Sequence, residues 1–112
     1  MYQILEELNK TSGVTGSMLV SQDGIVIAAD LESKLQDEIV GAMAASIMSA
    51  AQKSVERLNK TPLKQVTIEA SKGKMFLADV GIGVLVVTTE SEVNIGLVRL
   101  EIRNAAEKIK NR

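Results

Sequence analysis

The chain has 112 residues, 46% of them hydrophobic and 24% charged, which is enough for one domain with one core. Its 13 basic and 14 acidic side chains nearly cancel, and only Tyr2 and Phe76 are aromatic. Neither the basic footprint nor the stacking surface typical of nucleic-acid-binding proteins is present. The absence of cysteine excludes disulfides and thiolate metal sites, and with an N-terminal segment that lacks the pattern of a secretory signal it favours the cytoplasm.

The first half of the chain predicts a helix, a hairpin and a second, longer helix. Residues 2–10 place Ile4, Leu5 and Leu8 on one face of a short amphipathic helix. The segment "VTGSMLVSQDGIVIAAD" predicts two strands joined at Asp23-Gly24, because both turn positions tolerate positive φ. The long helix is expected from about residue 34 to 59, and Pro62 prevents it from continuing.

The second half predicts three strands and a closing helix. "LKQVTIEA", "MFLADV" and "VLVVTT" are separated by the turns "SKGK" and "GIG". A capping box from Thr89 to Glu92 is expected to open the last helix, which runs through "VNIGLVRLEIRNAAEKIKNR". We expect Val93, Leu97 and Leu100 to pack on the first helix or to form part of a partner site. The stripe expected in the core is Ile95, Val98, Ile102, Ala105, Ala106 and Ile109.

These elements predict a single α+β domain over residues 1–112, in the order α-β-β-α-β-β-β-α. The hairpin connections are short, so the five-stranded sheet should be mostly antiparallel, with helices on both faces in a three-layer α/β/α sandwich. "VLVV" and "IVIAA" are continuously apolar and are expected to be central strands, whereas the alternating "KQVTIE" suits an edge.

The middle of the long helix, "IVGAMAASIMSAA", carries no charge. A span of a bilayer needs about 20 apolar residues, so a buried or partnered helix is favoured. We expect the core side to contain Ile39, Val40, Met43, Ile47, Ala51, Val55 and Leu58.

Covering two faces of a five-stranded sheet takes more than three helices, so the small residues on the other flanks are predicted to pack against a second copy. An Ala-rich helix with a merely exposed side is the alternative, as is a solvated edge for the strand near residue 67. The predicted dimer interface comprises Gly41, Ala42, Ala45, Ser46 and Ser49 of the helix and Gln65, Thr67 and Glu69 of the strand.

The sequence shows no catalytic, cofactor-binding or metal-binding constellation. It has no histidine or cysteine, no close acidic pair and no calcium-loop pattern. Asp79 is expected at a strand end capped by a turn rather than as a buried functional acid, and "GIG" is expected to form a tight hairpin rather than a phosphate cradle. Arg99 or Arg103 could contribute its positive charge to the transition state of a phosphoryl transfer, but a surface ion pair between Arg103 and Glu107 is favoured. We expect no intrinsic enzymatic activity.

The order and spacing of several motifs resemble the roadblock/LC7 domain family, which includes the dynein light chain roadblock and the bacterial MglB-like proteins. The resemblance covers nearly the whole chain and rests on "GVTGSMLVSQDGIVIAAD", the Ala-rich central helix, "LKQVTIEASKGKMFLADVGIGVLVVTT" and "NIGLVRLEIRNAAEKI". It implies a profilin-like sandwich in which the first and last helices share one face. It also implies a dimer formed through the central helix and the strand that follows it.

The resemblance further implies a prokaryotic, non-catalytic, homodimeric regulator or scaffold that binds a Ras-like small GTPase and modulates its nucleotide cycle or localisation. A related second subunit would suit the same helix. The alternative is a structural adaptor or small-ligand sensor with no GTPase partner. The implied GTPase-binding surface is the exposed side of the central helix: Glu38, Ala42, Ala45, Ser49, Gln52, Lys53 and Glu56.

Overall fold

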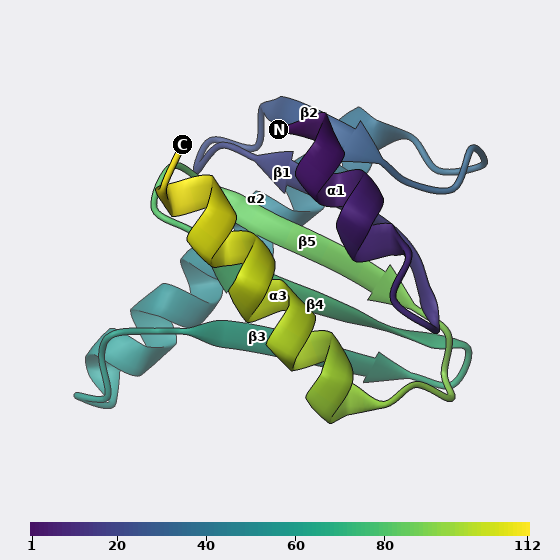
Figure 1. Cartoon of the computed structure of the whole chain (residues 1–112). Helices are drawn as coiled ribbons and strands as arrows, with labels where there is room; N and C mark the ends of the chain where they lie inside the picture. Colours follow the sequence, from purple (N-terminus) through teal and green to yellow (C-terminus); the bar gives the residue numbers. More distant parts are fainter.

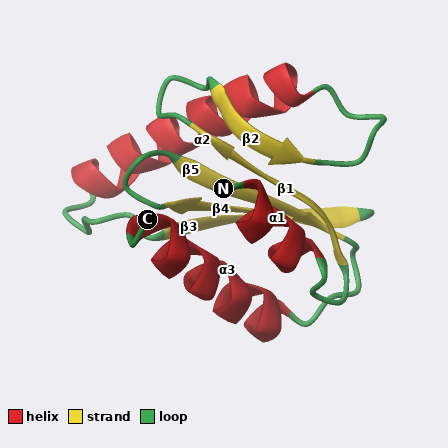
Figure 2. Cartoon of the chain, turned by 45° about the horizontal axis from the view of Figure 1, so that its top comes forward, coloured by secondary structure: helices red, strands yellow, loops and turns green.

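The computed structural model describes residues 1–112 as three helices and five strands in the predicted order (Figure 1). The elements are α1 (Tyr2–Asn9), β1 (Val14–Val20), β2 (Val26–Asp30), α2 (Asp37–Arg57), β3 (Gln65–Ala70), β4 (Gly73–Asp79), β5 (Val84–Thr89) and α3 (Ile95–Lys110). The sheet has the strand order β2-β1-β5-β4-β3, and every neighbouring pair is antiparallel. Helices α1 and α3 lie on one face and α2 on the other, which confirms the three-layer sandwich (Figure 2).

Each face of the sheet carries its own hydrophobic core. On one face, α1 and α3 pack over Leu19, Phe76 and Leu85, and on the other α2 packs over Met18, Leu77 and Val86. Burial of these side chains supplies the main driving force for assembling the three layers. The stripe predicted for α3 is confirmed, since its buried or half-buried members are Ile95, Val98, Ile102, Ala105, Ala106 and Ile109.

The two strands with continuous apolar runs have different places in the sheet. The prediction for β5 is confirmed, because it is the middle strand and its residues 84–87 are fully buried. The prediction for "IVIAA" is wrong, because β2 is an edge strand. Ile27 within it is 46% exposed, and Ile25 just before it is 68% exposed. Val20 pairs with Val26 but Leu19 pairs with Ala28, so Ile27 is the extra residue of a β-bulge.

The observed starts of α2 and α3 differ from two further predictions. Helix α2 begins at Asp37, three residues later than predicted. The predicted capping box at Thr89 and Glu92 is wrong, because Thr89 is the last residue of β5. Asn94 caps α3 instead, and its side chain accepts a hydrogen bond of 3.0 Å from the backbone N–H of Leu97.

Two apolar side chains of α3 are exposed. Of the three residues expected to pack on α1 or to form part of a partner site, Val93 is half-buried against the core, whereas Leu97 and Leu100 are 39% and 48% exposed. No helix of the protein combines the length and the apolar character that a membrane crossing would require.

Candidate functional site

Helix α2 packs on the sheet through small residues. Its buried members are Val40, Gly41, Ala44 and Met48. A Cβ at Gly41 would lie 3.0 Å from both the carbonyl oxygen of Gly24 and Cγ1 of Val20, so the helix approaches the sheet closely at this point. The predicted outward position of Gly41 is therefore wrong.

The predicted core side of α2 is also wrong in part. Val40 is buried, but Ile39, Met43 and Leu58 are 53%, 50% and 64% exposed. Because α2 lies close to the sheet around Gly41, the small residues Gly41 and Ala44 share its buried side with Val40 and Met48, and other large side chains are left on a flank. The helical period alone did not distinguish these two faces.

One flank of α2 lies along the hairpin that joins β1 and β2. A Cβ at Gly24 would lie 3.3 Å from Cα of Ala42 and 3.4 Å from Cβ of Ala45. Ala42, Ser46 and Ser49 are exposed beside this contact, and Ala45 is half-buried. An open hollow of about 540 Å³ runs between the hairpin and this flank, from Gln22 and Asp23 on one side to residues 42–53 on the other.

The opposite flank of α2 is apolar and borders an uncovered part of the sheet. Residues 39, 43 and 47 are spaced by four along the helix and so form one ridge on the side away from the hairpin. Helix α2 contacts β1, β2 and β5 and crosses behind the sheet (Figure 1), which leaves β3 and β4 partly bare on this face. Ile68 is 37% exposed there. We call this surface the apolar face: Ile39, Met43 and Ile47 of α2, Val66 and Ile68 of β3, and Met75 of β4.

Strand β3 forms the adjoining edge of the sheet, as predicted. Its backbone pairs only with β4, so its other side is unpaired. Gln65, Thr67 and Glu69 stand opposite residues 78, 76 and 74 and therefore face the α3 side. Gln65 and Thr67 are half-buried and Glu69 is exposed. These three side chains border the edge without contributing to the apolar face.

Neither arginine of α3 forms an ion pair. The ion pairs of the protein are Lys10 with Glu7 and Lys34 with Glu32, so the predicted pair between Arg103 and Glu107 is wrong. Nη2 of Arg99 donates instead to Oγ1 of Thr67 at 3.2 Å, which connects α3 to the edge strand.

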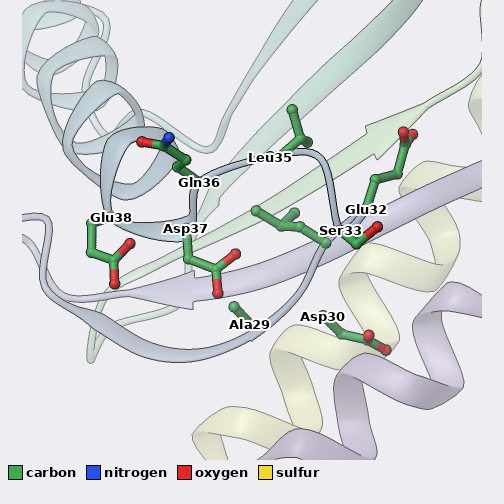
Figure 3. Close-up of a pocket in the computed structure, with 9 residues that line it drawn as sticks. Ala29, Asp30, Glu32, Ser33, Leu35, Gln36, Asp37 and Glu38 are labelled. Carbon is green, nitrogen blue, oxygen red and sulfur yellow. The ribbon is translucent and has the colours of Figure 1, made fainter.

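Several acidic side chains take part in hydrogen bonds and ion pairs within the fold. Asp79 ends β4 at a turn, as predicted, and its Oδ1 accepts a 2.8 Å hydrogen bond from the backbone N–H of Gly81. The "GIG" segment forms the predicted hairpin. An open hollow of about 400 Å³ beside residues 29–38 contains four carboxylates, but their side chains diverge (Figure 3). Asp30 accepts a hydrogen bond from Asn9, and Glu32 pairs with Lys34. This hollow therefore does not bring its carboxylates together.

Comparison with known proteins identifies the family to which this fold belongs. The sequence model of the Roadblock/LC7 domain matches residues 1–89. A protein of Methanocaldococcus jannaschii, MJ1340, is 45% identical over 108 residues, which cover 96% of this chain and 95% of that protein.

Two solved structures share the fold at low sequence identity. A Roadblock/LC7 domain from Streptomyces avermitilis superposes with a TM-score of 0.92 at 18% identity, covering 99% of this chain and 95% of that one. MglB of Myxococcus xanthus also gives 0.92, at 20% identity and with 98% and 91% covered. The chain therefore belongs to the Roadblock/LC7 domain family.

Proposed function

We propose that this protein is a non-catalytic, homodimeric regulator or scaffold that binds a Ras-like small GTPase in the cytoplasm and modulates its nucleotide cycle or localisation. The observation that carries the proposal is the apolar face, which lies beside the unpaired edge of β3. Family membership supports the same assignment, because the resemblance that predicted this fold also implies GTPase-binding dimers.

A second copy of the chain fits the apolar face. Half-exposed Met43 and Ile39 flank a bare strip of sheet, and a twin α2 laid over that strip would remove these side chains from water. The same two-fold operation would pair β3 with its copy and extend the sheet through both subunits. Ala42, Ala45, Ser46 and Ser49 would border the paired helices, with Gln65, Thr67 and Glu69 along the paired strands. A related subunit with the same face would form a heterodimer in this way.

The GTPase-binding surface is proposed on the outward side of α2. Glu38, Ala42, Ser49, Lys53 and Glu56 are exposed there. Ala45 and Gln52 are half-buried at its margin. Paired α2 helices would make this surface a shallow platform of small residues with charges at its ends, which permits close approach of a folded partner with little desolvation of charge.

The first experiment measures the molar mass by light scattering after size exclusion, over a dilution series. We expect a mass about twice 12.0 kDa that persists on dilution. Met43→Lys should lower the mass to that of one chain, because the new ammonium group would have to be buried without a partner. Ile25→Lys is the matched control, since Ile25 is even more exposed and lies on the β1–β2 hairpin. A monomeric parent protein, or equal effects of both variants, would refute the interface.

GTPase binding is tested with the Ras-like GTPases encoded in the same genome, each loaded with GDP or a GTP analogue. We expect complex formation to be weakened about tenfold or more by the charge reversals Lys53→Glu and Glu56→Lys combined, with the dimer mass unchanged. The control is Lys108→Glu combined with Glu107→Lys, which makes the same charge reversals on α3. Stimulated hydrolysis that survives Arg99→Ala and Arg103→Ala would argue against an arginine donated from α3.

A structural adaptor or a small-ligand sensor remains the alternative function. The hollow between α1 and α3 has a volume of only about 10 Å³, which is room for about one water molecule. This hollow is therefore too small to hold a small ligand. Native mass spectrometry of the purified protein distinguishes the two, because a sensor would carry a bound small molecule.

A further inference from the structure

A second surface lies on the face of the sheet opposite α2, between α3 and the neighbouring ends of β3 and β4. It is an open groove of about 580 Å³. The groove has an apolar floor, because Ala78 and Ile102 are 5% and 1% exposed and Ala106 is half-buried beside them. None of its lining residues belongs to the apolar face.

The walls of this groove carry positive charge. Lys64 lies at the start of β3, and Arg103 and Lys110 lie on α3; all three are exposed. None of them has a carboxylate within 4.0 Å, since the ion pairs of the protein lie elsewhere. The one acid that lines the groove is Asp79, whose carboxylate already accepts the Gly81 N–H. Three cations against one acid leave an uncompensated positive charge of two.

The positive wall extends along α3. Residues 99, 103, 106 and 110 are spaced by four, three and four, so they share one flank of the helix. The hydrogen bond from Arg99 to Thr67 shows that this flank faces β3. The row from Arg99 to Lys110 is roughly 16 Å long at the helical rise, which matches about five residues of extended chain.

We propose that this groove binds an acidic, extended segment of a partner protein. In an extended chain successive side chains point to opposite sides, so carboxylates could reach Arg103 and Lys110 while small apolar residues rest on Ala78, Ile102 and Ala106. A single chain contains the whole groove, so the proposal does not depend on dimer formation.

The shape and composition of the groove favour a peptide over other anionic partners. Single-stranded nucleic acid is bound with aromatic stacking, but Phe76 is fully buried and Tyr2 is the only other aromatic residue. A bilayer surface attracts basic residues that project from the protein, whereas Arg103 and Lys110 border a concave floor.

The test uses a short fluorescein-labelled peptide that alternates glutamate with valine, titrated with the full chain and followed by fluorescence anisotropy. We expect saturable binding that weakens with salt, and no binding of the glutamine–valine analogue. Arg103→Gln with Lys110→Gln should weaken binding about tenfold or more, because two charge-assisted contacts are lost. Lys72→Gln with Lys108→Gln removes the same charge from outside the groove and should change the affinity less than about twofold.

Three outcomes would overturn the proposal: no saturable binding, equal binding of the uncharged analogue, or equal losses in the two double variants. Sedimentation with phosphatidylserine vesicles that depends on Arg103 and Lys110, in the absence of peptide binding, would identify the groove as a lipid-binding surface and would also overturn it. Circular dichroism and the solution mass confirm that each variant is folded. Since the dimer mass is measured separately, failure here is distinguishable from failure of the proposed function.

Discussion

At the scale of single residues, Gly83 determines how closely two strands approach. It is buried in the turn before β5, and a Cβ at this position would overlap the backbone carbonyl oxygen of Val20 at the end of β1. Backbone atoms of a central strand cannot move aside cheaply, so Gly83→Ala should destabilise the protein by about 2–3 kcal/mol in urea unfolding.

Gly96→Ala is the control for this substitution. Gly96 lies in α3 with only the side-chain oxygen of Asn94 nearby, at 3.4 Å from an added Cβ. Alanine is the better helix former, so this variant should be neutral or more stable by about 0.5 kcal/mol. Equal destabilisation by the two substitutions would contradict the close approach of Gly83 to β1.

Tyr2 gives a pH-dependent signal that can be assigned without ambiguity, because it is the only tyrosine. The negative charge of Asp30 is the main cause that raises the pKa of the Tyr2 phenol above its ordinary value near 10, followed by partial desolvation and the charge of Glu6. The folded protein therefore holds this proton more tightly than the unfolded chain. The resulting stabilisation is present below about pH 10 and is lost as pH rises through the folded-state pKa.

Absorbance titration of the tyrosinate should show this raised midpoint directly. Asp30→Asn removes the nearest charge and should move the midpoint down towards the ordinary value, whereas Glu6→Gln should move it less. An unchanged midpoint in Asp30→Asn would assign the shift to another cause.

At the scale of elements, the start of α3 tests which residue caps the helix. Asn94→Ala removes the hydrogen bond to the Leu97 N–H and should cost about 1 kcal/mol of unfolding free energy. Glu92→Ala, at the residue that the sequence pattern assigned to a capping box, should change the stability by less than about 0.5 kcal/mol. Chemical denaturation of both variants measures the difference, and a larger effect of Glu92→Ala would contradict the cap at Asn94.

The order of the elements could be predicted from the sequence because turns and periods are local signals. The hairpin at Asp23-Gly24 and the alternation around Val66 depend only on nearby residues, and both agree with the structure. The position of β2 at an edge could not be predicted, because it depends on the pairing of β1 with β5, a strand distant in sequence. The exposure of Ile27 depends on a bulge in the register between β1 and β2, which the apolar run does not indicate.

The candidate site was predicted less completely than the fold. Helix α2 has apolar side chains on more than one side, and only the sheet determines which side is buried. Met43 was assigned to the core, although it belongs to the apolar face, and Gly41 was assigned to a surface, although it is buried. The row of small residues at 41 and 44 was the signal of a helix that packs closely against its own sheet.

At the scale of the whole molecule, dimer formation should make the stability depend on concentration. If folding is coupled to association, mass action raises the midpoint of thermal unfolding as the protein concentration rises. We expect this rise in differential scanning fluorimetry of the parent protein and of Ile25→Lys, and a midpoint independent of concentration in Met43→Lys. A midpoint that does not move in the parent protein would indicate that no dimer is populated at the temperature of unfolding.

The bulge in β2 has a consequence for growth beyond two copies. In the proposed dimer, pairing of two β3 strands would use up one edge of each sheet and leave a β2 strand at each end of the doubled sheet. A strand of five residues, distorted where Ile27 is inserted, is a poor template for further strand addition. Only the regular edge could propagate pairing, so this arrangement would protect the molecule from polymerising end to end into fibres.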